Sequence, residues 1–378
     1  MSVQDFQQAL DQAFATIHRT IPVMGTDRPC RGRPDLTYER CDDKNWVDGF
    51  WSGQLWLAYA ETQDDFFFQA ARQQRPYFLE RLERPDSHDH DLGFLYSLSA
   101  VADFKLTGDE EARQMGLAAA ESLASRYNPA GRFIRAWNPW YAADGSLIVE
   151  NAGRIIIDCA ENLGLLFWAA QESGNTRYAE IATAHAHTSV KNLVRPDGST
   201  YHSFHFDPQS GAPLRGETVQ GYANESCWSR GQAWGIHGYA VAYAYTGVPL
   251  FLETARQLAD FAIANLPDDG VPLWDYRLPA GEHPYRDTSA AAIMAAGLFV
   301  LADNDVGNGA AEYRAVAQRT LHSLYAHYST AGHPTAEGLL REGASFVRAG
   351  HADNMLPYGD YFYVEALLRA LGRKDFFW

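Results

Sequence analysis

The sequence predicts an all-α protein built as an (α/α)6 toroid, in which a ring of six inner helices is wrapped by six outer helices. Two observations lead to this prediction. Six segments are apolar nearly all round, and six amphipathic segments alternate with them along the chain. A helix that is apolar on every side has to be buried, whereas a helix with one polar face borders solvent. Repeating this alternation over residues 1–378 predicts a single domain. An irregular helical domain is the alternative.

The six apolar segments are the expected inner helices. Each opens with a charged residue and continues into glycine, alanine and aromatic residues. The openings are Asp48, Asp91, Asp158, Arg230, Asp287 and Asp360. They lie 43, 67, 72, 57 and 73 residues apart, which fits one structural unit repeated with loops of variable length. We therefore expect the openings to surround one rim, where helix N-termini supply a positive partial potential that suits an anionic ligand.

The six more polar segments are the expected outer helices. They cover residues 3–21, 64–83, 109–127, 176–194, 249–266 and 311–328. In the fifth segment, Phe251, Ala255 and Leu258 recur at helical spacing with polar residues between them. Glycine-containing turns such as LTGD and ESGN precede several of these segments and predict where one helix stops and the next begins.

Composition and charge exclude several classes of protein. Of the 378 residues 46% are hydrophobic, which is enough for a large core, and the formal net charge of −16 argues against nucleic-acid binding. No run approaches the roughly eighteen apolar residues of a membrane span, and no signal peptide is visible. The four cysteines show no CxxC spacing. A reducing, cytoplasmic location is therefore expected.

Asp91 and Asp158 are the candidate proton-transfer groups. Asp158 follows three isoleucines, so desolvation is expected to raise its pKa, and a shared cavity with Asp91 would raise one of the two pKa values further. A carboxyl that stays protonated near neutral pH can donate a proton. The alternative is that both acids cap their helices, and the residues by themselves favour capping. Asp48, Asp287 and Asp360 are expected to be mostly structural.

The stretch from Ser87 to Asp91 reads SHDHD, and an HxH pair with nearby acids is a pattern that binds zinc. Metallohydrolases with that pattern are usually β/α barrels, and no parallel-strand pattern occurs in this chain. We therefore expect His90 to be structural or to contact a ligand.

Several other polar residues leave two interpretations open. His202 is either a surface histidine or a catalyst, and Gln220 marks either the edge of a pocket or a plain turn. Arg230 opens a buried helix between Trp228 and Trp234, where a guanidinium is costly unless it meets an anion. That anion is either one of the opening aspartates or a substrate carboxylate.

Aromatic residues are abundant, with 10 Trp, 20 Tyr and 20 Phe. Aromatic faces fill cores and also stack on sugar rings, and the count does not separate these uses. Trp46 stands just before the first inner helix. Trp137 and Trp140 lie in a long loop over residues 128–151, which has the composition of a pocket wall.

Seven ordered stretches resemble the unsaturated glucuronyl hydrolases of glycoside hydrolase family 88. They are NWVDGFWSGQLWLAY, HDLGFLYSLSA, NAGRIIIDC, STYHSFHFDPQSG, SRGQAWGI, PYRDTSAAAI and YGDYFYVEALLR. The resemblance extends from about Asn45 to the C-terminal helix, and the first forty or so residues match poorly. It implies the same (α/α)6 fold that the repeat predicts.

The resemblance also implies an activity and a set of site residues. Asp158 would be the main catalyst and Asp91 its partner, and the sugar contacts would come from Trp46, His90, Trp137, His202, Gln220, Trp228, Arg230 and Trp234. The substrate would be a small oligosaccharide with a C4=C5 double bond, which is hydrated without any metal or organic cofactor. No nucleic acid or membrane partner is expected, and the assembly is expected to be a monomer or a weak homo-oligomer.

Substrate class and rival functions follow from the same resemblance. Members that favour sulfated glycosaminoglycan fragments tend to carry Ser and Lys in the loop before the last helix, but residues 348–355 offer only Arg348 and His351 as contacts. We therefore expect unsulfated or weakly sulfated substrates. The rivals are an unsaturated rhamnogalacturonyl hydrolase, a sugar epimerase that uses a pair of histidines, and a non-catalytic glycan-binding toroid. The pair of acids argues against the last.

Overall fold

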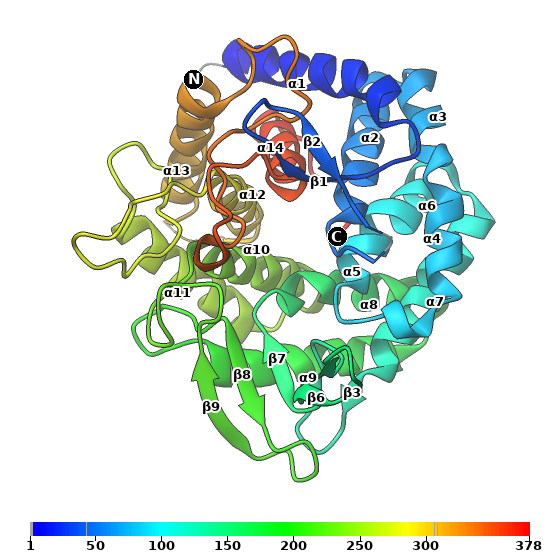
Figure 1. The fold of residues 1–378 in the computed structure, drawn as a ribbon, viewed down its shortest axis with the longest axis vertical. Helices are drawn as coiled ribbons and strands as arrows, with labels where there is room; N and C mark the ends of the chain where they lie inside the picture. Colours follow the sequence, from blue (N-terminus) through cyan, green and yellow to red (C-terminus); the bar gives the residue numbers. More distant parts are fainter. Residues whose placement is uncertain (1–2, 43, 306, 308) are drawn as a thin grey trace.

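The computed structural model describes residues 3–42, 44–305, 307 and 309–378. Its inner ring consists of α2 (Asp48–Thr62), α5 (Leu92–Tyr96), α8 (Cys159–Ser173), α10 (Ser229–Thr246), α12 (Thr288–Asn304) and α14 (Pro357–Ala370). A π-helical turn, η2 (Ser97–Val101), continues α5 into α6 (Ala102–Thr107). Each inner helix packs on the next, and α14 packs back on α2, so the ring closes (Figure 1).

The outer ring consists of α1 (Val3–Met24), α3 (Asp65–Gln73) with α4 (Arg75–Leu82), α7 (Glu110–Ser125), α9 (Thr176–Leu193), α11 (Pro249–Ala264) and α13 (Gly309–Ser323) with the π-helical η3 (Leu324–Tyr328). All twelve predicted segments are helical, which confirms the (α/α)6 fold. The second outer segment is divided near Gln74 because Pro76 follows, and proline fits the first turn of a new helix better than a helix interior.

Short antiparallel strands lie in the loops. They form the pairs β1 (Pro29–Gly32) with β2 (Tyr38–Arg40), β3 (Tyr127–Asn128) with β4 (Phe133–Ile134), and β5 (Trp140–Tyr141) with β6 (Leu147–Val149), and a sheet of β7 (Arg154–Ile156), β8 (Ser203–Phe206) and β9 (Pro213–Glu217). The three-stranded sheet was not predicted. In it Ile156 pairs with Ser203, so the chain segment before α8 runs beside the segment that carries His202.

Glycine residues allow the inner helices to approach closely. At each of the six inner interfaces, a Cβ added to one glycine would come within 2.2–3.0 Å of the neighbouring helix. The pairs are Gly49 with Phe94, Gly93 with Asn162, Gly238 with Ala160, Gly297 with His237, Gly359 with Ser289, and Gly53 with Tyr361. Contacts below 3 Å exclude any larger residue unless a helix moves. We refer to these six residues as the interface glycines.

The core fills the centre of the ring. Phe94 and Trp234 approach to 5.1 Å between ring centroids, and Phe362 stacks on Trp378 at 5.6 Å. The C-terminus therefore lies in the middle of the barrel rather than on its outside (Figure 1). Among the described residues, no helix combines the length and the apolar character that crossing a membrane requires.

Candidate active site

Asp91 and Asp158 immediately precede α5 and α8, and neither side chain caps its helix. Both residues are only 6% exposed. The interpretation of these acids as helix caps is therefore wrong. The physical reason is that Asp158 follows the buried residues Ile155, Ile156 and Ile157 at the end of β7. Tertiary packing of this segment, rather than the start of the helix, positions the carboxyl.

The two helices that carry these acids are in contact at their first turns. A Cβ on Gly93 would lie 2.4 Å from the Cα of Asn162, and the backbone N–H of Phe94 donates to Oδ1 of Asn162 at 2.8 Å. This packing brings Asp91 and Asp158 close enough for each charge to influence the other. The structure thus joins the two predicted acids at one rim of the ring.

Burial raises the pKa of Asp158 to about 7, against the opposing effect of the Arg230 charge. Burial also raises the pKa of Asp91 well above its usual range, with further contributions from the charges of Asp89 and Asp158. The shifts therefore favour the protonated form of both carboxyls, and the pKa of Asp158 is close to neutral pH. A carboxyl whose pKa matches the working pH can serve both as proton donor and as proton acceptor.

A buried histidine accompanies each acid. Nε2 of His90 lies 3.4 Å from Oδ1 of Asp91, and Nε2 of His202 lies 3.8 Å from Oδ2 of Asp158. Burial lowers the pKa of His202 to about 3 and that of His90 well below 6.5, so both rings are neutral. The backbone N–H of Gln220 donates to Nδ1 of His202 at 3.3 Å, which leaves the proton on Nε2. The interpretation of His202 as a surface residue is wrong, because it is 1% exposed.

Several buried polar atoms in this region form no hydrogen bond with another described residue. They are both ring nitrogens of His90, Nε2 of His202 and Oδ2 of Asp158. Buried polar groups in folded proteins are normally paired. A cluster of unpaired donors and acceptors around two carboxyls is therefore suited to a polar ligand.

Arg230 forms the predicted salt bridge with an opening aspartate. Its Nη1 donates to Oδ2 of Asp287 at 2.8 Å and to the carbonyl of Ala344 at 2.6 Å. Its Nη2 donates to Oε1 of Gln220 at 3.2 Å and to the carbonyl of Ser345 at 2.6 Å. Asp287 also caps α12. Arg230 is thus a buried anchor that fixes the side chain of Gln220 and the start of the loop before α14.

Ring contacts connect the remaining predicted residues. Trp137 lies 6.1 Å from His202, and His202 lies 4.8 Å from Trp228. The guanidinium of Arg230 lies 4.4 Å from the centre of the Trp228 ring. On the other side, Trp46 stacks on Tyr358 at 4.9 Å, and Tyr358 lies 5.1 Å from the same guanidinium. Trp234 is connected to these residues through Phe94, whose ring contacts both Trp46 and Trp234. All ten predicted residues therefore belong to one connected cluster.

Sequence reasoning missed two members of this cluster. Asp89 adds a third acid, and its Oδ1 accepts from the backbone N–H of Asp91 at 2.9 Å. Tyr358 carries a buried hydroxyl. Its signal was its position two residues before Asp360, at the true start of the last inner helix. Asp360 itself accepts hydrogen bonds from Tyr38, Leu339 and Leu340, so its expected structural role is confirmed.

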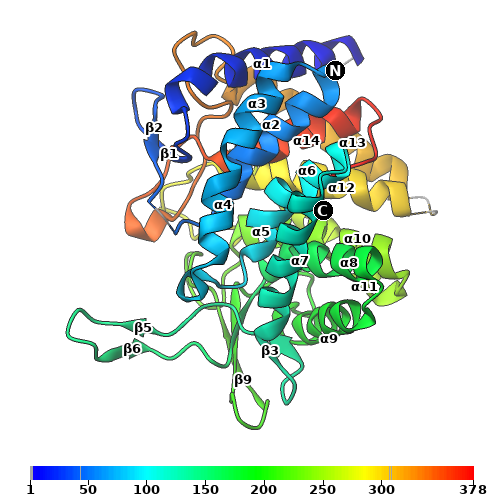
Figure 2. The ribbon, with the colours of Figure 1, turned by 90° about the vertical axis from the view of Figure 1, so that its right-hand side faces the viewer.

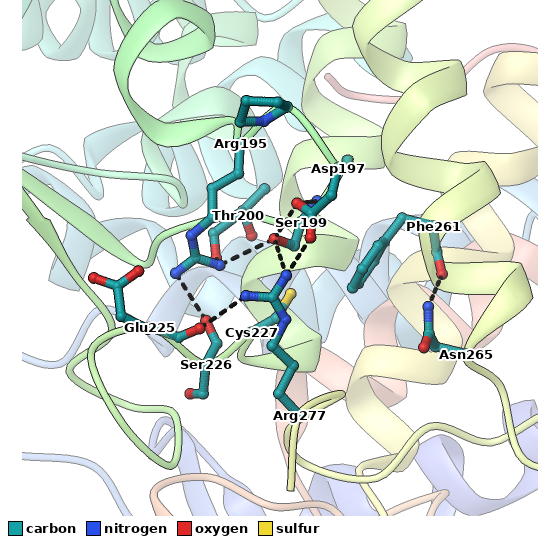
Figure 3. Close-up of polar contacts among 12 residues, drawn as sticks. Arg195, Asp197, Ser199, Thr200, Glu225, Ser226, Cys227, Phe261, Asn265 and Arg277 are labelled. Carbon is teal, nitrogen blue, oxygen red and sulfur yellow. Dashed lines mark hydrogen bonds and ion pairs between the residues drawn. The ribbon is translucent and has the colours of Figure 1, made fainter.

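Two arginines brace the loops that present His202 and Trp228 (Figure 3). Arg195 donates to the carbonyl of Thr200 at 3.1 Å and to that of Ser226 at 2.9 Å, so it ties the two loops together. Arg277 donates to the carbonyl of Glu225 at 2.9 Å and forms an ion pair with Asp197. The backbone is thereby fixed two residues before His202 and two residues before Trp228.

In the SHDHD stretch, which resembles a zinc-binding pattern, both ring nitrogens of His88 contact neighbouring parts of the protein. His88 contacts Oγ of Ser122 at 2.7 Å and the carbonyl of Arg81 at 2.9 Å, so it serves the scaffold. Within the described ranges, no group of three or more His, Cys, Asp or Glu side chains is arranged to hold a metal ion.

The family model for Glycosyl Hydrolase Family 88 matches residues 32–367. An unsaturated glucuronyl hydrolase from Bacillus sp. strain GL1 is 42% identical over 96% of this chain and 96% of its own length. A crystal structure of unsaturated glucuronyl hydrolase from Bacillus sp. GL1 superimposes with a TM-score of 0.91, at 40% identity and 96% coverage of both chains.

A variant of the Streptococcus agalactiae unsaturated glucuronyl hydrolase has been solved in complex with dGlcA-GalNAc6S. The match covers 100% of this chain and 94% of that chain, with a TM-score of 0.86 and 31% sequence identity. Both the family model and these relatives extend over nearly the whole chain, including every residue of the cluster. The chain belongs to glycoside hydrolase family 88.

Proposed function

We propose that this protein releases the unsaturated glucuronic acid from the non-reducing end of small oligosaccharides that polysaccharide lyases produce. The names of its relatives support this activity. The observation that carries the proposal is the setting of Asp158. Its carboxyl is buried, caps no helix and lies among unpaired polar groups, and burial raises its pKa to about 7, which suits proton transfer. The four cysteines form no disulfide, in keeping with the expected cytoplasmic location.

In the proposed reaction Asp158 acts first as an acid and then as a base. Its protonated carboxyl transfers a proton to C4 of the C4=C5 bond, and the positive charge that develops is shared between C5 and the ring oxygen. Water adds to C5 and gives its proton to the Asp158 carboxylate, which restores the acid. The resulting hemiketal opens by breaking the bond from C5 to the ring oxygen, and the hemiacetal formed at C1 expels the neighbouring sugar.

The surrounding residues would bind and orient the sugar. Neutral His90 and His202 supply donors and acceptors beside the two acids, and Gln220 is held in place by Arg230. Burial and the charges of Asp89 and Asp158 raise the pKa of Asp91, which favours its protonated form as a hydrogen-bond donor beside Asp158. The tryptophans of the cluster would face the sugar rings.

Weak tolerance of sulfate is part of this proposal. The loop before α14 leaves the site at Ser345, whose carbonyl is bound by Arg230, and Arg348 follows three residues later with an exposed side chain. Arg348 and His351 are the basic residues that this segment offers in place of a Ser/Lys set. Arg348 would therefore be the first contact of a sulfate on the second sugar.

The test is a panel of unsaturated disaccharides from hyaluronan, unsulfated chondroitin, sulfated chondroitin and rhamnogalacturonan, assayed without added metal. We expect loss of the ultraviolet absorbance of the C4=C5 uronate, fastest with the unsulfated glucuronyl substrates. Turnover of the rhamnogalacturonan disaccharide alone would assign the protein to the rival hydrolase activity. Binding by calorimetry without turnover of any substrate would indicate a glycan-binding toroid, and an epimerised product in the NMR spectrum would indicate an epimerase.

The pH dependence should follow the protonation of Asp158. Because the pKa of this carboxyl is raised to about 7 and the acid form is required, kcat/KM should be highest below pH 7. Above pH 7 it should fall about tenfold for each pH unit. The measurement is kcat/KM in overlapping buffers, with circular dichroism at each pH to confirm folding. A rate that stays constant or rises between pH 7 and 9 would contradict the role of Asp158 as an acid.

A further inference from the structure

The hairpin formed by β5 and β6 projects away from the barrel (Figure 2) and exposes an unusual amount of apolar surface. Nine large hydrophobic side chains are exposed in the described part of the chain, and four of them are on this hairpin. They are Trp140 (45% exposed), Tyr141 (61%), Leu147 (51%) and Ile148 (63%). Apolar side chains gathered on one exposed element indicate an interaction site.

The base of this hairpin is fixed next to the site. Nδ2 of Asn151 donates to the carbonyl of Asn138 at 2.8 Å, which closes the loop. Nδ2 of Asn138 donates to the carbonyl of His88 at 2.9 Å, and Oδ1 of Asn138 accepts from Nη1 of Arg126 at 3.0 Å. The base of the hairpin is therefore hydrogen-bonded to the short segment that carries His90 and Asp91. These bonds fix the position of the hairpin relative to the two acids.

The apolar surface of the hairpin is continuous with the predicted sugar contacts. The rings of Trp140 and Trp137 lie 5.5 Å apart at an angle of 32°. Trp137 in turn lies under the guanidinium of Arg154 at 4.8 Å and beside His202, whose Nε2 is 3.8 Å from Asp158. A series of rings thus leads from the reacting carboxyl outward to Trp140.

We infer that Trp140 forms an outer sugar-binding subsite for the reducing-end part of oligosaccharides longer than a disaccharide. This inference rests on the proposed function, because it takes the unsaturated uronate to be bound at Asp158 and the remaining sugars of the oligosaccharide to extend outward from there. An exposed indole offers an uncharged flat face to the C–H face of a sugar ring. The two acidic side chains of the hairpin, Asp144 in its turn and Glu150 at its base, accept hydrogen bonds from nearby backbone N–H groups.

The test compares Trp140→Ala with Leu214→Ala, a matched control that removes another exposed apolar side chain (59% exposed) from a different strand, β9. Both variants and the parent are assayed on an unsaturated disaccharide and on the unsaturated tetrasaccharide of the same polymer. For Trp140→Ala we expect KM to rise about three- to tenfold on the tetrasaccharide. The disaccharide kinetics and the control should not change.

Three results would overturn this inference. Unchanged tetrasaccharide KM in Trp140→Ala would show that the ring binds no sugar, and an equal rise for both substrates would show that it only supports Trp137. A shift from dimer to monomer in light scattering, without a change in the ratio of the two KM values, would assign the hairpin to contacts between copies of this chain. If the parent turned over neither substrate, the proposed function would fail separately, and calorimetry with the tetrasaccharide would still test the subsite.

Discussion

Asp158→Asn is expected to abolish turnover of the unsaturated disaccharide and to leave the fold intact. The amide keeps the shape of the side chain but cannot give a proton to C4 or take one from water, and loss of general acid–base catalysis costs about 10²- to 10⁴-fold. The carboxyl caps no helix and burial raises its pKa to about 7, so the neutral amide should cost little stability. The measurements are kcat, the far-ultraviolet circular dichroism spectrum and the Tm.

Asp360→Asn is the matched control. Asp360 also lies at the start of an inner helix, and burial raises its pKa to about 7 as well. Its oxygens, however, accept from the hydroxyl of Tyr38 at 2.6 Å and from the backbone N–H groups of Leu339 and Leu340. This variant should lower the Tm and keep its turnover number. Substantial activity in Asp158→Asn, or an equal loss in Asp360→Asn, would refute the assigned role of Asp158.

Arg230→Met is expected to lower the free energy of unfolding by about 3–5 kcal/mol, because it leaves one charge of a buried pair without its partner. Arg230 and Asp287 are 1% and 0% exposed, and the carbonyls of Ala344 and Ser345 lose their donors at the same time. Urea titration followed by fluorescence measures the loss. Turnover should fall as well, since the side chain of Gln220 loses the hydrogen bond that holds it in place.

Two further variants test the cause of that loss. Arg177→Met breaks an ion pair with Glu121 in which both side chains are about half exposed, so it should cost less than about 1 kcal/mol. Adding Asp287→Asn to Arg230→Met removes the unpaired buried charge and should recover part of the stability. If the surface variant and the buried variant lost equal stability, the buried pair would have no special role.

The helical architecture could be predicted from local patterns because the distribution of apolar and polar residues in each helix reflects whether that helix is buried or borders solvent. A segment such as α12, whose residues Thr288 to Ala302 are all buried, is apolar throughout, and the segments around it have one polar face. The division of the second outer segment before Pro76 also follows a local rule. The sheet of β7, β8 and β9 depends on pairing between distant segments, which periodicity does not reveal.

The roles of the acids could not be decided from the sequence alone. Asp91, Asp158, Asp287 and Asp360 occupy equivalent openings, yet Asp287 caps its helix while Asp91 and Asp158 do not. The difference arises from neighbours that lie far away in sequence, such as Arg230 for Asp287 and Tyr38 for Asp360. For the same reason Tyr358 was missed, since its contacts with Trp46 and with the guanidinium of Arg230 join residues that lie far apart in the sequence.

The interface glycines have a consequence for how the protein tolerates change. In a closed ring, the rotations from each inner helix to the next must add up to one full turn. A helix displaced by an added methyl group at one interface therefore requires a compensating rotation elsewhere in the ring. The separation of the carboxyls of Asp91 and Asp158 is thus a property of the whole circumference. We therefore expect this separation to respond also to steric changes on the far side of the barrel, at Gly297 or Gly359.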